Sequence, residues 1–325
     1  MLDTVTLPMT LALERDQKIV SIPLQTHRAD ASPFRNIRRI LLPFDRSRVG
    51  VSALRVVTQL AEKSNAAIHL LHVVPPSESS EVVPKSFRAD DHLAEASERL
   101  LKHWLKRIVR NRVKTFISLR IGDPVDVIVA RAVATRADLI VLTSRSCSGS
   151  ALEFQRSTAE RVSRIAPCPV LTIPEKCTDR LAYSEIPFAS DWRTILVPVD
   201  FSSVAEEAVR TATRFANATG GKLLLAHGCD LEEADEPLVH EPLRNWVTRV
   251  VGDTVPWWTA IWPGGHSLYA ILSEATRAEA NLIVLPTATQ PWARRLRAGS
   301  ITDGVLRHAP CPVLSINNNV ITREH

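Results

Sequence analysis

Short apolar runs alternate with amphipathic stretches along most of the chain. Apolar runs of strand length occupy residues 39–45, 68–74, 139–143 and 170–173, and residues 115–121 alternate between apolar and polar as a half-buried strand does. Between these runs, apolar side chains recur at helical spacing over residues 48–63, 90–110, 125–136 and 158–165. Because strands alternate with helices, we expect parallel pairing, right-handed crossovers and a three-layer α/β fold.

The second half of the chain repeats the pattern of the first. Residues 164–173 (RIAPCPVLTI) recur 143 positions later as residues 307–316 (RHAPCPVLSI), whereas 40–45 (ILLPFD) recur 155 positions later as 195–200 (ILVPVD). The difference places a loss of 12 residues between His227 and Gly265. The repeat predicts two like domains. Their expected boundaries are residues 37–174 and 192–318, with a linker at 175–191 and an extension at 1–36.

Composition is that of an ordinary globular protein, with 45% hydrophobic and 23% charged residues among 325, enough for two cores. The net charge of +5 is spread along the chain. In the densest basic stretch, residues 102–110, apolar residues interrupt the charges at helical spacing, which favours a solvated helix face over a nucleic-acid patch. Nucleic acid is therefore not an expected partner. No apolar run reaches the ~18 residues of a membrane helix, so a membrane is not an expected partner either.

Five cysteines, an odd number without a CxxC pair, give no support to a zinc site or to dithiol chemistry. This usage fits a reduced, cytoplasmic setting. Three tryptophans, Trp257, Trp258 and Trp262, fall on the third strand of the second copy. We interpret them as core or interdomain packing, with the lining of a hydrophobic pocket as the alternative.

Candidate functional residues follow from the predicted topology, because ligands of doubly wound sheets bind at the carboxyl ends of the strands. In the first copy these positions are Asp45, His72, Gly122 and the loop after Thr143; in the second they are Asp200, His227, Gly265 and the loop after Leu285. Each aspartate either contacts a ligand or accepts local backbone N–H groups in a turn. For each histidine a structural hydrogen bond is favoured over a catalytic base, since no nucleophile or acid is placed beside it.

Several of these repeated segments together resemble the universal stress protein family. They are the first strand ending in Asp45, Gly122-Asp123-Pro124 before a helix, residues 138–141 (DLIV) and residues 166–171 (APCPVL). The resemblance covers about residues 38–174 and 193–317. It implies a doubly wound, five-stranded parallel sheet in each of two tandem domains, paired through their last strands across a pseudo-twofold axis. That arrangement is an intrachain pseudo-dimer, and it leaves open a homodimer of tandem chains.

Many bacterial members of that family bind ATP through the pattern G-x2-G-x9-G-[ST], and others do not bind it. Glycines there let backbone N–H groups approach phosphates, and the closing Ser or Thr starts a helix whose N-terminus attracts anions. The matching positions in the first copy are Thr143, Ser146, Arg156 and Ser157, and in the second copy Pro286, Thr289, Gly299 and Ser300. The first copy thus has none of the three glycines, and the second has one.

The resemblance therefore predicts a non-catalytic stress-response protein that acts by ligand binding and dimer-type scaffolding, with the phosphate motif degraded in both copies. The alternative is a sensor that binds ATP or another adenine nucleotide in the second domain only. A nucleotide hydrolase or transferase is a third hypothesis. No paired carboxylates, metal ligands or nucleophile–base set in the sequence support it.

Overall fold

A computed structural model describes residues 37–45, 47–74, 113–144, 157–177, 192–229, 236–263, 265, 267–287 and 301–321. The extension at 1–36, the helix expected at 90–110 and most of the expected linker lie outside these residues.

The first copy forms the predicted alternation of strands and helices. Its elements are β1 (Arg39–Pro43), α1 (Arg48–Ser64), β2 (Ala67–Val74), β3 (Thr115–Ile121), α4 (Pro124–Thr135), β4 (Leu139–Ser144), α5 (Thr158–Ile165) and β5 (Val170–Pro174). We call this part the first domain.

The second copy, which we call the second domain, repeats that order. Its elements are β6 (Thr194–Pro198), α7 (Ser203–Thr219), β7 (Lys222–Cys229), α8 (Glu236–Val251), β8 (Trp257–Pro263), α9 (Leu268–Arg277), β9 (Leu282–Pro286), α10 (Ile301–His308), β10 (Val313–Ile316) and α11 (Asn318–Ile321).

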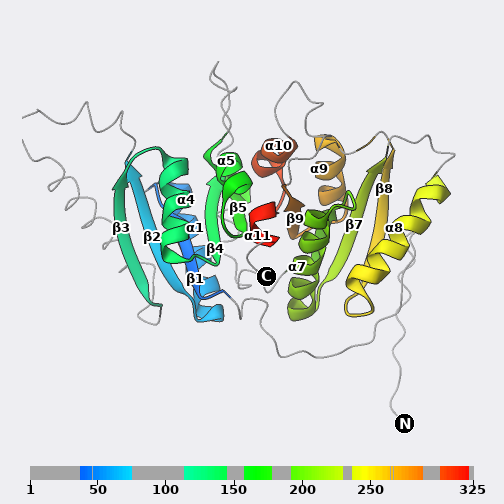
Figure 1. The fold of residues 1–325 in the computed structure, drawn as a ribbon, viewed down its shortest axis with the longest axis horizontal. Helices are drawn as coiled ribbons and strands as arrows, with labels where there is room; N and C mark the ends of the chain where they lie inside the picture. Colours follow the sequence, from blue (N-terminus) through cyan, green and yellow to red (C-terminus); the bar gives the residue numbers. More distant parts are fainter. Residues whose placement is uncertain are drawn as a thin grey trace, which may run out of the picture.

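All of these strands join one ten-stranded sheet in the order β3-β2-β1-β4-β5-β10-β9-β6-β7-β8. Neighbours within each domain are parallel, and only β5 and β10 pair antiparallel. In that central pair Leu171 lies opposite its own counterpart, Leu314. The register is therefore symmetric about this pair, as the predicted pseudo-twofold axis requires. Figure 1 shows the two halves side by side, with α5, α10 and α11 between them.

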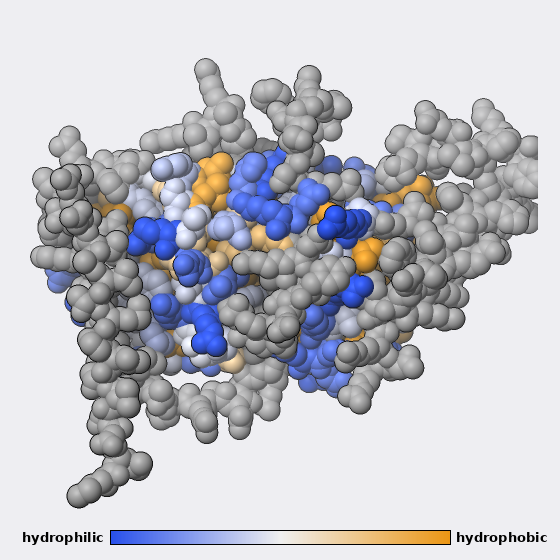
Figure 2. All heavy atoms as spheres, turned by 180° about the vertical axis from the view of Figure 1, so that it is seen from behind, coloured by the Kyte–Doolittle hydropathy of each residue, from blue (hydrophilic) through white to orange (hydrophobic). Residues whose placement is uncertain are grey.

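Helices cover both faces of the sheet, which gives the predicted three layers. On one face, buried residues of α1, α7 and α8 form a single core that continues across the seam through Leu171, Ile173, Leu314 and Ile316. On the other face the core is divided, with α4 and α5 over the first domain and α9 and α10 over the second. On the surface seen in Figure 2, hydrophilic side chains surround smaller apolar areas. In the described part of the chain, no helix combines the length and the apolar character that a membrane span needs.

Side chains of each domain cap the helix that faces them from the other domain. Ser144 Oγ donates to the carbonyl of Leu306, and the equivalent Thr287 Oγ1 shares its proton between the carbonyls of Ile316, at 3.1 Å in its own domain, and Ser163, at 3.3 Å across the seam. Asn317 Nδ2 donates to the carbonyls of Ser163 and Ala166 at 2.9 and 3.0 Å. The last carbonyls of an α-helix have no partner within the helix. The seam thus satisfies the ends of α5 and α10 from across the domain boundary.

We expect Asn317→Ala to lower the free energy of unfolding by about 1–3 kcal/mol, because it leaves buried carbonyls of Ser163 and Ala166 without this donor. The control is Asn319→Ala, which removes one exposed hydrogen bond to Ile165 and should change stability by less than about 0.5 kcal/mol. Urea unfolding of both full-length variants measures the difference. Equal effects of the two substitutions would contradict the proposed capping role of Asn317.

Candidate functional site

Asp45 and Asp200 form the same hydrogen-bonded turn in the two domains. Asp45 Oδ1 accepts from the amide and the hydroxyl of Ser47, at 3.1 and 2.6 Å, and Asp200 Oδ1 accepts from Ser202 in the same way at 3.1 and 2.5 Å. Each serine then accepts from a first-turn amide and caps the following helix, α1 or α7. The carboxylates therefore fix the strand-to-helix turns at the carboxyl edge of the sheet.

The two predicted histidines also have equivalent partners. His72 Nδ1 lies 2.8 Å from the carbonyl oxygen of Phe44, and His227 Nδ1 lies 2.7 Å from that of Val199. Because a carbonyl only accepts, Nδ1 carries the proton, and in the neutral ring Nε2 is the acceptor nitrogen. Each histidine thus ties the second strand of its domain to the residue that follows the first strand. This contact agrees with the structural hydrogen bond that the sequence favoured over a catalytic base.

Phe201 is a residue of this edge that the sequence did not single out. Its backbone is left-handed, with φ of 62°, which is uncommon for a bulky side chain. Its ring centroid lies 4.6 Å from that of His227 and 5.6 Å from that of Trp246 on α8. The sequence shows only Asp-Phe-Ser between a strand and a helix, so the ring contacts with α8 had no local signal. The equivalent position of the first domain, Arg46, lies outside the described residues.

Gly122 and Gly265 begin the turns after the third strands. Their φ angles are 150° and 84°, where an L side chain is strained. A Cβ on Gly122 would also lie 2.9 Å from Val127. The next residue, Asp123, caps α4; hydrogen bonds from the amides of Asp126 and Val125 and the charge of Arg161 lower the pKa of its carboxyl group. The geometry fits the turn role that the sequence favoured for these glycines.

The structure describes three of the positions that match the phosphate motif. Thr143 and Pro286 occupy equivalent places near the ends of β4 and β9, where they lie opposite Ile173 and Ile316. Ser157 caps α5, as expected, and its Oγ also donates to Asp303 Oδ1 of the second domain at 2.8 Å. The other predicted positions, Ser146, Thr289, Gly299 and Ser300, lie outside the described residues.

The tryptophans of β8 lie mainly in the core. Trp257 and Trp262 are buried, and the Lys222 ammonium group lies over the ring of Trp258. These contacts agree with the packing interpretation.

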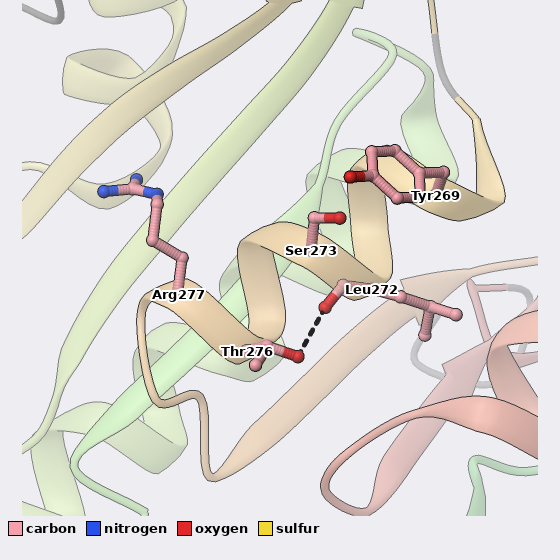
Figure 3. Close-up of a pocket in the computed structure, with 5 residues that line it drawn as sticks. All are labelled: Tyr269, Leu272, Ser273, Thr276 and Arg277. Carbon is pink, nitrogen blue, oxygen red and sulfur yellow. Dashed lines mark hydrogen bonds between the residues drawn. The ribbon is translucent and has the colours of Figure 1, made fainter. Parts of the chain in front are cut away.

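A surface concavity lies nearby on the outer face of α9 (Figure 3), where Tyr269, Leu272, Ser273, Thr276 and Arg277 follow one another at helical spacing. It does not contain any residue predicted to bind a ligand. Among the described residues, no group of three or more His, Cys, Asp or Glu could hold a metal ion.

Comparison with known proteins gives one family. The model of the universal stress protein family matches residues 36–174, 191–242 and 264–317. The unmatched segment between the last two ranges holds the second half of α8 and all of β8, where the four tryptophans Trp246, Trp257, Trp258 and Trp262 lie.

Individual relatives resemble either one domain or the whole fold. A universal stress protein of Thermus aquaticus is 31% identical over 135 residues, which are 38% of this chain and 98% of that protein. One from Methanocaldococcus jannaschii is 29% identical over 144 residues, 42% of this chain and 81% of the relative. The crystal structure of a universal stress protein from Archaeoglobus fulgidus covers 85% of this chain and 94% of its own, with a TM-score of 0.66 and 21% identity, which supports the fold.

We expect Ser202→Ala to destabilise the protein by about 0.5–2 kcal/mol, because it removes both the cap of α7 and the hydroxyl donor to Asp200. Ser203→Ala, at the exposed neighbouring position, is the control and should cost less than about 0.5 kcal/mol. Thermal unfolding followed by circular dichroism compares the two variants. If Ser202→Ala were as stable as the control, the turn would not depend on this serine.

Proposed function

The chain belongs to the universal stress protein family, and we propose that it is a non-catalytic member that acts in the stress response by binding a ligand and by presenting two paired domains as a scaffold. The domains that we propose are residues 37–174 and 192–318.

The observation that carries this proposal is the use of the aspartates and histidines at the carboxyl edge of the sheet. Asp45 and Asp200 accept hydrogen bonds from serines of their own turns, and both histidines donate from Nδ1 to backbone carbonyls. A catalytic base needs to be within reach of the proton that it removes. Aspartates that accept from serines of their own turns support binding and rigidity more than proton transfer, and the turnover assay below tests the imidazole Nε2 atoms, which these hydrogen bonds do not use.

An adenine nucleotide in the second domain is the second candidate function. Its support is Gly299-Ser300, the part of the phosphate motif that the second copy keeps, which directly precedes α10. The amides at the start of a helix favour an anion. In the first domain the corresponding residues are Arg156 and Ser157, so we propose no nucleotide there. Pairing into a homodimer of tandem chains stays a proposal as well.

Mass spectrometry of the small molecules released by denaturing the purified protein tests both candidates. A released adenine nucleotide would favour the second candidate, and Gly299→Arg should then abolish it because the new side chain would enter the phosphate position. Tyr269→Arg is the control, since it adds the same charge on the exposed surface of α9, and it should keep the ligand. A protein that carries no nucleotide and binds none on titration would remove the second candidate.

A turnover assay with purified protein and ATP tests the non-catalytic assignment. We expect no ATP hydrolysis above that of a protein-free blank, either in wild type or in the His72→Ala/His227→Ala double variant, because both imidazoles serve the fold. Sustained turnover by wild type would contradict the assignment, and its loss in a double variant that circular dichroism shows to be folded would assign the activity to these histidines.

A further inference from the structure

The hydroxyl of Ser157 already has a partner for its only proton. Ser157 Oγ accepts from the amide of Glu160 at 3.2 Å and donates to Asp303 Oδ1 at 2.8 Å. A serine hydroxyl has a single proton to donate, and the ionised oxygens of an oxyanion only accept. An oxyanion that approached this hydroxyl would therefore have to take the proton from Asp303.

Asp303 comes from the other domain and brings a negative charge to the start of α5. It lies in the first turn of α10, and its side chain is largely buried, with 17% exposed. Its second oxygen forms an ion pair with Arg307 of its own helix, at 2.9 Å from Nε. The carboxylate is thus held on both sides and remains between the two helices.

The arginines described on α5 are also paired with carboxylates. Arg164 pairs with the buried Glu160 at 3.0 Å, and Arg161 lies 3.5 Å from Asp123. Glu160 is the counterpart of Asp303 in the repeat, and it pairs within its own helix as Asp303 pairs with Arg307. The carboxylate of Asp303 therefore repels an approaching oxyanion and also competes with it for the Ser157 proton. The nearby described cations do not offset this repulsion, because they are already paired with carboxylates.

We propose that Asp303 is a specificity-determining residue that the second domain contributes to the first: it excludes oxyanions from the start of α5. The ligand of the first domain is then one that presents an uncharged or hydrogen-bond-donating group at Ser157. This inference rests on the proposed function as a ligand-binding protein, and it names the class of ligand that the first domain accepts.

The test is a titration of the full-length protein with inorganic phosphate, followed through the amide resonances of residues 158–160 so that binding is localised to the first domain. Wild type should show weak or no saturable shift. Asp303→Asn, which removes the charge and keeps the size, should bind phosphate at least about tenfold more tightly. Asp303→Ser serves the same purpose if Asp303→Asn does not fold. The control is Glu206→Gln on α7, which removes one negative charge elsewhere and should behave as wild type.

A second substitution locates the effect at the hydroxyl. Adding Ser157→Ala to Asp303→Asn should lower the affinity for phosphate again because it removes the hydroxyl donor, whereas the part of the gain that comes from the lost charge remains. Equal phosphate affinity in wild type and both Asp303 variants would overturn the proposal, and so would a gain that Ser157→Ala does not reduce. Because phosphate is the probe, these results do not depend on which ligand the purified protein carries. A failure here is therefore distinct from a failure of the proposed function.

Discussion

The antiparallel pairing of β5 with β10 is the interaction on which the rest of the structure depends. It joins two parallel sheets into one and aligns Leu171 with its counterpart Leu314. Because this register is symmetric, α5 and α10 are brought to equivalent places beside the seam, where each is capped from the opposite domain. The continuous core on one face follows from the same pairing, since Leu171 and Leu314 both belong to it. Neither domain buries these groups without the other.

The carboxyl edge of the sheet shows how one set of residues can serve the fold where a ligand was expected. An aspartate after the first strand orders a serine, the serine caps a helix, and a histidine from the next strand bonds to the turn. The same arrangement recurs in the second domain, where Phe201 is added against His227 and Trp246. Groups constrained in this way form a rigid surface. A ligand that binds to such a surface immobilises few further side chains, so the loss of conformational entropy is small.

Local sequence pattern was sufficient for most of the fold. Apolar runs and helical spacing located the strands and helices that the structure describes in the first domain, because the positions that face a core recur with the period of the strand or helix. The repeat and the family resemblance predicted the pairing of β5 with β10. By contrast, the contact between Ser157 and Asp303 joins residues 146 positions apart on two helices, and no local rule relates them. The left-handed backbone of Phe201 was missed for the same reason, because contacts with residues distant in sequence hold the ring.

Asn317 stands where the symmetry of the repeat would place Pro174, a residue with no side-chain donor. In a symmetric dimer of two separate chains, any substitution at the seam appears twice, so a change that suits one side is imposed on the other as well. Fusion into a single chain removes that restriction. Asn317 can bond to the end of α5, while the first domain uses Lys176 to reach the carbonyl of His308 at the end of α10. The tandem arrangement thus allows the two sides of one interface to change independently while their central register stays matched.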